Sequence, residues 1–475
     1  MNSISAEQSI NHGQKSSKSW AIASLALIML LSSLGTSIAN IGLPTLASAF
    51  SASFQNVQWV VIAYLLAMTV LVVTMGRLGD LLGRRRLLLM GLVVFSLASV
   101  ACGLANDLWL LICARLIQGA GAAAMMALTM AFVGDIVPKD KAGSAMGLLG
   151  TMSAIGTALG PSLGGVLIAY LGWRAIFLIN LSLGIVALVM AYCYLPSQRP
   201  LAERSRFDSQ HFDLGGISSL AIALMLYSLA VTLGHGNFGL VNLALLMGAA
   251  LGVWVFIVIE RRAVSPLVHL GLFRNPLLNA GFVSSTLVAT VIMATLVVGP
   301  FYLTGALGLN AAGAGLLMSA GPIVSALTGV PAGRIVDRFG TESTSILGLV
   351  GMLLGASLLV IMPTHIAGYL APLILMTVGY ALFQVANNTS VMAAGTSDQR
   401  GLVSGMLNLS RNLGLITGAS VMGAVYAYGV KRAGDIHSEA VVAGMHWVFT
   451  LATILIAIAL VVTALARRFS VRVAS

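Results

Sequence analysis

Long apolar segments that recur along the whole chain constrain its fold more than any other feature. Runs of about 18 or more predominantly apolar residues follow one another almost from end to end, and each can cross a hydrocarbon layer about 30 Å thick as an α-helix. Lipid offers the backbone no hydrogen-bond partner, so a segment inside it must be a helix or a barrel strand. These runs are too long and too uniformly apolar for strands. The sequence therefore predicts an all-α integral membrane protein, in keeping with 58% hydrophobic residues, 8% charged residues and a mean hydropathy of +0.98.

Hydropathy along the chain predicts about fourteen membrane spans. They are expected near residues 20–43, 57–75, 87–105, 108–131, 143–170, 175–195, 214–234, 240–260, 278–304, 312–332, 344–362, 367–393, 401–428 and 442–466.

The basic residues predict how these spans are oriented. With the N-terminus placed inside, only Arg174, Lys431 and Arg432 fall in outer loops, Arg115 and Arg411 fall within spans, and the other Lys and Arg are cytoplasmic. The positive-inside rule demands this asymmetry. The net charge of +11 therefore indicates membrane orientation and not nucleic-acid binding. We expect a multi-pass protein of the inner (plasma) membrane with both termini in the cytoplasm.

Two landmarks repeat within the chain at nearly the same spacing. A charged turn at Gly76–Arg86, between the second and third spans, has a shorter copy at Gly333–Gly340, 257 residues later. Five glycines of the fifth span recur after 258 residues; they are Gly143, Gly147, Gly156, Gly160 and Gly165, with counterparts Gly401, Gly405, Gly414, Gly418 and Gly423. The spacing predicts two six-helix bundles in a parallel pseudo-repeat, an architecture that binds substrate between the bundles near the midplane.

The expected organisation follows from this repeat. Residues 1–19 form a disordered cytoplasmic tail, because they are polar and rich in serine, and 20–195 form the N-terminal bundle. Residues 196–275 are a linker with two additional spans. The C-terminal bundle covers 276–468, and 469–475 form a second cytoplasmic tail.

The charged turn and its copy are candidates for a conformational hinge. Glycine permits the tight turns that closely spaced spans require, and Asp80 can accept from a helix N-terminus or pair with Arg84. Such a pair could latch the cytoplasmic side in one state and break in another, while the arginines also anchor the topology. The hinge candidates are Gly76, Asp80, Gly83, Arg84, Gly333, Asp337 and Gly340.

Four motifs at fixed places in the spans carry a resemblance. They are the turn Gly76–Arg86, the fourth-span segment Arg115–Gly121, the fifth-span segment Gly156–Gly165 and the first-span segment Asn40–Pro44; Trp173, Arg174, Phe177 and Asn180 add a further match. Together they resemble the major facilitator superfamily, and more narrowly its fourteen-span drug:proton antiporter branch. The resemblance implies a transporter that works by rocker-switch alternating access, and it is far less specific for the substrate.

The fifth span carries a face of small residues. Gly156, Gly160 and Gly164 recur every four residues, which lets a neighbouring helix approach closely, and Pro161 bends the helix. The face, completed by Gly165, could seal or slide between the bundles, or it could serve tight packing alone. The second copy has Ala419 in place of Pro161. By resemblance, this asymmetry favours export.

Arg115 and Arg411 are the charges deepest in the predicted spans. A buried cation is costly, so each is a functional candidate. Arg115 resembles the family arginine implicated in proton transfer, and Arg411 could bind a substrate anion or cap a polar network. With Asp107 they are the coupling candidates. The candidates for the substrate cavity are Asn40, Tyr64, Gln118, Gln384, Asn387 and Asn388, although such groups also join helices to one another.

One departure from the family pattern concerns coupling. The first-span motif normally carries an aspartate five residues before its asparagine, where this chain has Gly35, and none of the 14 acidic residues lies in the middle of a predicted span. An exporter of cations ordinarily needs a membrane carboxylate, since burying a lone cation is expensive. Two interpretations remain open: a drug antiporter that uses Asp107 or a loop acid, and an exporter of anionic or neutral metabolites. A protein that has lost transport is disfavoured, because the repeat, the hinge turns and both glycine strips are all present.

We interpret the chain as a multidrug or small-molecule efflux transporter, proton-coupled by resemblance. The alternative is an exporter of an anionic or neutral metabolite that uses Arg115 and Arg411, with non-standard coupling because of Gly35. No nucleotide-binding loop or paired-histidine metal motif is present, so no enzyme activity, cofactor or metal is expected. The expected partners are a small-molecule substrate, protons, membrane lipid and, as one option, a periplasmic adaptor protein around a monomer.

Overall fold

The computed structural model describes residues 2–136, 142–196, 214–232, 239–263, 273, 275–361, 364–394, 400–433 and 437–474. Its helices are α1 (Asn2–Ala49), α2 (Phe54–Leu82), α3 (Arg84–Gly103), α4 (Leu108–Ile136), α5 (Ala142–Leu171), α6 (Ala175–Tyr194), α7 (Leu214–Thr232), α8 (Leu240–Arg262), α9 (Pro276–Gly305), α10 (Ala311–Phe339), α11 (Thr341–Ile361), α12 (Ile366–Ala394), α13 (Arg400–Thr417), the π-helix η5 (Gly418–Met422), α14 (Gly423–Arg432) and α15 (His437–Ala474). No strand occurs in these described ranges.

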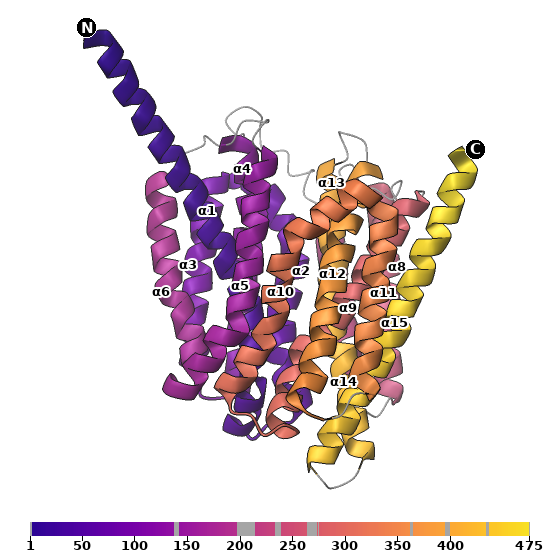
Figure 1. Ribbon diagram of the computed structural model, residues 1–475. Helices are drawn as coiled ribbons and strands as arrows, with labels where there is room; N and C mark the ends of the chain where they lie inside the picture. Colours follow the sequence, from indigo (N-terminus) through magenta and orange to yellow (C-terminus); the bar gives the residue numbers. More distant parts are fainter. Residues whose placement is uncertain are drawn as a thin grey trace.

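The helices form two side-by-side groups whose axes run roughly in one direction (Figure 1). Helices α1–α6 pack on one another, and α9–α15 do the same, while α7 and α8 pair together and α7 also contacts α2 and η5. Both chain termini lie at one end of the molecule, which we call the terminal end. The opposite end, called the distal end, carries the connections at residues 50–53, 104–107, 172–174 and 306–310.

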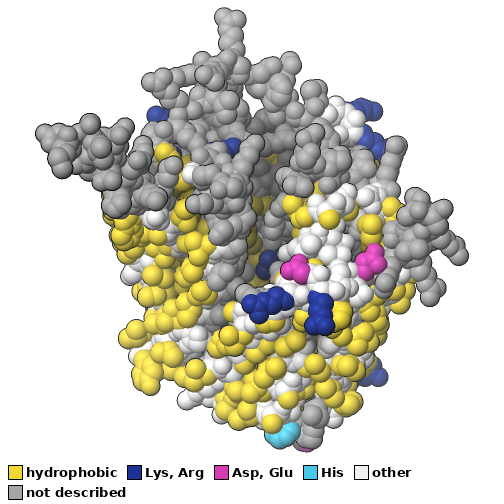
Figure 2. Space-filling view, turned by 45° about the horizontal axis from the view of Figure 1, so that its top comes forward, with side chains coloured by type: hydrophobic (Ala, Val, Ile, Leu, Met, Phe, Trp, Pro, Cys, Tyr) yellow, Lys and Arg dark blue, Asp and Glu magenta, His cyan; other side chains and the backbone are white. Residues whose placement is uncertain are grey.

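The predicted all-α membrane architecture is confirmed. Within the described residues, twelve helices are long and apolar enough to cross a membrane, and two further apolar segments, Ile155–Leu171 and Gly215–Ala230, are shorter. The count of fourteen spans stays a prediction, since twelve helices meet the length and hydropathy of a span and the two shorter segments overlap the predicted spans 143–170 and 214–234. Hydrophobic side chains cover much of the flank seen in Figure 2, where most of the coloured charged side chains lie toward the terminal end.

Helix reaches into both of the expected tails, and their disorder and cytoplasmic location stay a prediction. Helix α1 begins at Asn2 and α15 continues to Ala474, so helix extends into both 1–19 and 469–475. No proline occurs before Pro44, and once a helix has nucleated, each added residue gains a hydrogen bond at small cost. Composition alone could not show that the adjoining spans extend in this way.

The internal repeat is visible in the way the helices cross. A Cβ on Gly121 of α4 would lie 2.8 Å from the carbonyl oxygen of Gly91 in α3, and a Cβ on Gly379 of α12 would lie 2.5 Å from that of Gly348 in α11. Both crossings therefore bring backbones into contact where only glycine fits. Gly121 and Gly379 are 258 residues apart, the spacing of the fifth-span glycines. This fixes which residues of α4 and α12 are equivalent.

Glycine is required where the two charged turns end a helix. Gly83 follows α2 with φ +93°, and Gly340 follows α10 with φ +82°, values that side chains other than glycine rarely adopt. The tight turns predicted at these two positions are present. The side chain of Asp80 lies outside the described part of the structure, so its pairing with Arg84 stays a prediction.

Replacing Gly83 by alanine is expected to destabilise the protein by about 1–3 kcal/mol, because the new Cβ would be held in a strained backbone conformation. Gly76→Ala is the control. Nothing lies within 4 Å of a Cβ at Gly76, and alanine favours a helix over glycine by about 0.5–1 kcal/mol. Thermal unfolding of the purified variants in detergent measures both. Equal midpoints for the two variants would contradict the role assigned to the turn.

Candidate functional site

Arg115 lies at the centre of a buried hydrogen-bond network. It is 0% exposed in α4. Its Nε donates to the carbonyl oxygen of Val60 at 2.8 Å, and its Nη1 donates to that of Gly35 at 3.1 Å and to Oε1 of Gln118 at 2.6 Å. Gln118 in turn donates to Oγ of Ser99 at 2.7 Å. One guanidinium thus ties α1, α2 and, through Gln118, α3 to α4.

Only neutral groups stabilise the charge of Arg115 among the residues that the structure describes. Its guanidinium carbon lies 4.2 Å from the ring centroid of Tyr64 and 5.9 Å from that of Phe177, within the range of cation–π attraction. The Tyr64 hydroxyl donates to the carbonyl oxygen of Ser32 at 3.0 Å. No carboxylate of the described residues pairs with Arg115, and its Nη2 finds no hydrogen-bond partner among them.

Gly35 provides the group that meets Arg115 on the first helix. The family pattern places a carboxylate here, whereas in this chain the backbone carbonyl accepts from the guanidinium. A Cβ at Gly35 would lie 3.1 Å from Cζ of Phe95 and 3.2 Å from the hydroxyl of Tyr64. The pocket is therefore already filled by aromatic side chains. The sequence marked Gly35 as a departure, but a backbone ligand leaves no trace in residue type.

The acidic residues lie at the ends of the helices. Every Asp or Glu within α2–α15 is no more than two residues from an end of its helix. Asp107, a predicted coupling candidate, precedes α4, is exposed, and accepts from the backbone N–H of Leu110 at 2.8 Å. That is an N-cap interaction, which accounts for Asp107 on structural grounds.

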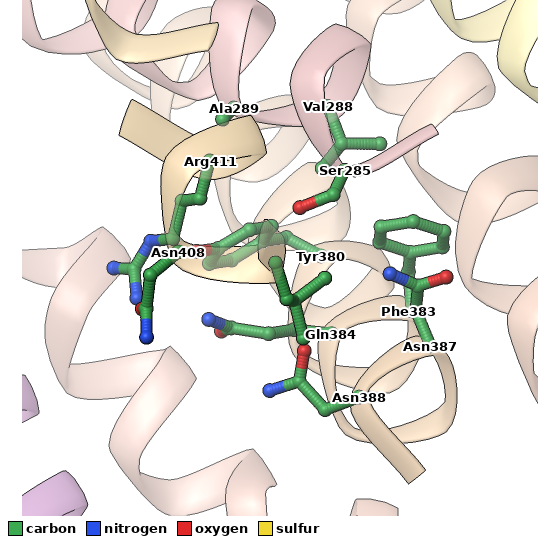
Figure 3. Close-up of a pocket in the computed structure, with 11 residues that line it drawn as sticks. Ser285, Val288, Ala289, Tyr380, Phe383, Gln384, Asn387, Asn388, Asn408 and Arg411 are labelled. Atoms are coloured by element: carbon green, nitrogen blue, oxygen red, sulfur yellow. The ribbon is translucent and has the colours of Figure 1, made fainter. Parts of the chain in front are cut away.

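A second polar centre lies between α9, α12 and α13. It is a cavity of about 50 Å³, smaller than the roughly 300–1,000 Å³ of typical ligand sites. Its lining residues are Ser285, Val288, Ala289, Tyr380, Phe383, Gln384, Asn387, Asn388, Leu407, Asn408 and Arg411. Figure 3 shows the polar ends of Arg411, Asn408 and Gln384 directed to one side of this cavity. Arg411 forms no ion pair with any residue that the structure describes.

The structure separates the predicted cavity residues into two sets. Gln384, Asn387, Asn388 and Arg411 come together in the cavity, where Asn387 also donates to the carbonyl oxygen of Gly281 at 3.2 Å. The other three candidates are Asn40, Tyr64 and Gln118, which are fully buried among α1–α6 and do not line the cavity. Sequence reasoning did not single out Tyr380 or Ser285, because a hydroxyl on an apolar helix has no distinctive pattern.

The glycine face of α5 serves two contacts. A Cβ on Gly156, Gly160 or Gly164 would come within 3.0 Å of α1, whereas one on Gly165 would lie 2.6 Å from the carbonyl oxygen of Ala311 in α10. The first three glycines therefore pack within one helix group, and Gly165 packs between the two groups. Tight packing thus accounts for the first three glycines and a contact between the groups for Gly165, while sealing or sliding along this face stays a prediction.

Further contacts between the groups lie toward the distal end. The Phe54 ring is 4.6 Å from Phe301 and 4.8 Å from Tyr426, centroid to centroid. Gln58, which is buried, donates through Nε2 to the carbonyl oxygen of Ala419 at 2.9 Å. Ala419 belongs to η5, where the wider π-helical turn changes the usual backbone bonding. The cavity with Arg411, by contrast, lies nearer the terminal ends of α12 and α13.

Comparisons with known proteins agree with this architecture. The model of the Major Facilitator Superfamily matches residues 25–301 and 281–474. The uncharacterised transporter YebQ of Escherichia coli is 32% identical over 85% of this chain and 88% of its own length. Multidrug resistance protein Stp of Mycobacterium tuberculosis is 31% identical over 87% of this chain and 76% of its own. A bacterial homologue of the human lysosomal transporter Spinster shares the fold, with a TM-score of 0.70, 14% identity and coverage of 95% and 97%. The chain is a multi-pass membrane protein and belongs to the Major Facilitator Superfamily.

Proposed function

We propose that the protein exports small organic molecules across the inner (plasma) membrane by alternating access, with its terminal end in the cytoplasm. One observation carries the proposal: a polar cavity lies in the terminal half of the molecule, while aromatic and backbone contacts join the two helix groups in the distal half. That arrangement suits the uptake of a molecule from the cytoplasmic side. The multidrug resistance relative supports efflux as the direction.

Proton antiport is the proposed source of energy. Since the acidic residues of α2–α15 lie at helix ends, a proton carrier in mid-membrane would have to be a group other than a carboxylate. The test uses inside-out vesicles with an imposed pH gradient, acidic inside, and two fluorescent compounds, cationic ethidium and anionic fluorescein. Accumulation of either dye with collapse of the gradient supports proton-coupled export. Accumulation with an unchanged gradient supports export with another driving force.

Locking the distal end is expected to stop transport. Phe54→Cys and Tyr426→Cys, in a background lacking Cys102, Cys113 and Cys193, place two thiols where rings now lie 4.8 Å apart. A short bis-methanethiosulfonate should join them and hold the distal contacts closed, so dye accumulation should fall to background and return after reduction. Each single-cysteine variant treated with the same reagent is the control. Undiminished transport by the cross-linked protein would rule out distal opening as a step.

A further inference from the structure

We propose that the cavity between α9, α12 and α13 binds a small amphiphilic organic anion, with Arg411 as the partner of its charged group and the carboxamides of Gln384, Asn388 and Asn408 as hydrogen-bonding contacts. The inference rests on the proposed export function and names the substrate class for it. The binding site itself can be tested without measuring transport.

The charge in the cavity carries the first part of the inference. Arg411 is the one charged side chain among the lining residues that the structure describes, and it is only partly buried. A guanidinium binds a carboxylate or sulfonate through two parallel hydrogen bonds. A cationic compound would meet this charge without any carboxylate to offset it, since Asp and Glu within α2–α15 stay near helix ends. The cavity therefore favours anions over cations.

Three carboxamides add neutral hydrogen-bonding groups to the cavity. Gln384, Asn388 and Asn408 each line the cavity, are not fully buried, and have no hydrogen bond to another described residue. Carboxamides both donate and accept hydrogen bonds. Three of them beside one guanidinium can satisfy the remaining oxygens of an anionic group together with neutral polar atoms next to it.

The internal repeat supplies the apolar part of the site. With the 258-residue spacing fixed by Gly121 and Gly379, Gln384 corresponds to Met126 and Asn388 to Met130 in α4, and both methionines are only partly buried. In a parallel repeat, equivalent positions face each other across the central axis at the same depth. The repeat thus puts flexible methionines, which adapt to varied apolar shapes, at the α4 positions that correspond to the amides of α12. The cavity lining itself adds Val288, Phe383 and Leu407, so a flat apolar body with an anionic head matches the site.

Equilibrium binding to the purified full-length protein in phosphatidylcholine nanodiscs tests this proposal. The probes share one ring system and differ in head group: 2-naphthoate, 2-naphthamide and 2-naphthylmethylammonium. We expect 2-naphthoate to bind at least about tenfold more tightly than the ammonium compound, the scale of one charge-assisted hydrogen bond. Arg411→Gln should weaken naphthoate binding about tenfold, and Arg411→Lys, which keeps the charge, should restore part of it.

Two matched variants separate the amide contacts from the charge. Gln384→Met gives the α12 position the residue of its α4 counterpart, and should weaken naphthoate and naphthamide alike. Arg262→Gln removes an exposed arginine of α8 and should change nothing. Gel filtration and thermal unfolding establish that each variant is folded. Equal affinity for the anion and the ammonium compound, or unchanged naphthoate binding in folded Arg411→Gln, would overturn the proposal.

Three outcomes keep this proposal distinct from its alternatives. If phosphatidylglycerol in the nanodisc displaces 2-naphthoate completely, the cavity serves a lipid headgroup and the assignment to an exported anion is wrong. If 2-naphthoate binds through Arg411 but vesicles transport no compound, export fails while the anion site stands. If vesicles export ethidium and Arg411→Gln alters neither binding nor transport, export stands and the anion site fails.

Discussion

Replacing Arg115 by methionine should slow transport by about 10- to 100-fold while leaving thermal stability nearly unchanged. Two opposing contributions to the free energy of unfolding make stability insensitive to this substitution. Taking a guanidinium out of water costs several kcal/mol, and its charge-assisted hydrogen bonds, worth about 1.5–3 kcal/mol each, offset that cost. Methionine would leave few buried acceptors stranded, because the carbonyls of Gly35 and Val60 lie inside helices and keep their partners four residues on.

Transport is sensitive because Arg115 holds several helices in one arrangement. Its bonds to Gly35, Val60 and Gln118 join α1, α2 and α3 to α4, so the loss of any one lets these helices shift against each other. A loss of about 1.5–3 kcal/mol in one conformational step corresponds to the stated fall in rate. Dye accumulation in vesicles and unfolding in detergent measure the two effects separately.

Lysine at the same position provides the sharper control. Arg115→Lys keeps a positive charge but cannot reach three acceptors in a plane, so it should be nearly as slow as Arg115→Met. Arg174→Gln, at an exposed distal arginine, should transport normally. Full transport by Arg115→Lys would show that charge alone matters at this site. A large loss of stability in Arg115→Met would assign Arg115 to folding.

Gly156→Ala should lower thermal stability, whereas Gly315→Ala should open the distal end, although each places a Cβ against a backbone carbonyl oxygen. A Cβ at Gly156 would strike the carbonyl oxygen of Leu30 within one helix group, and a Cβ at Gly315 would strike that of Pro161 in the other group. Backbone atoms cannot rotate aside, so each collision costs about 1–3 kcal/mol. Helices α1 and α5 can relieve it only by separating, which lowers the unfolding temperature. The two groups can relieve it by moving apart at the distal end.

Gly315→Ala is therefore expected to expose the distal contacts by about 10- to 100-fold at little cost in thermal stability. A cysteine at Phe301, in the background without native cysteines, reports this opening through its rate of labelling by a membrane-impermeant maleimide. Gly329→Ala lies on the same helix, where a Cβ meets nothing within 4 Å, and should label like the parent protein. If Gly315→Ala instead unfolds early and labels slowly, the α5–α10 contact does not open during transport.

The sequence predicted the architecture well because membrane solvation acts on every residue of a span. Apolar length, basic loops and the repeated glycines each report a constraint that continues over many residues. Individual side-chain contacts were harder to predict from the sequence. Arg115 and Gly35 were both singled out, yet their connection runs through a backbone carbonyl that residue type does not encode. Asp107 accepts from the backbone at the start of α4, a local contact that residue type did not reveal, and its part in coupling stays a prediction.

The candidate cavity was predicted in part for a similar reason. Gln384, Asn387 and Asn388 stand close together in sequence, and Arg411 lies on the following helix, so adjacency of the two helices brings them together. Asn40 and Tyr64 face the interior of their own group and do not reach the cavity. A polar residue in a span shows that some partner is needed, but helix rotation decides whether that partner is another helix or the cavity.

The two helix groups interrupt the equivalent helix in different ways, one by a proline in α5 and the other by the π-helical turn η5. Ala419 occupies the place that Pro161 holds 258 residues earlier, and both positions interrupt regular α-helical bonding. Proline lacks the N–H that would close the turn, so the missing backbone hydrogen bond in α5 cannot form in any conformation. A π-helical turn keeps every donor and can tighten into α-helix by a shift of one residue. The interruption at Pro161 in α5 is therefore permanent, whereas the equivalent interruption at η5 can change with the conformation of the protein.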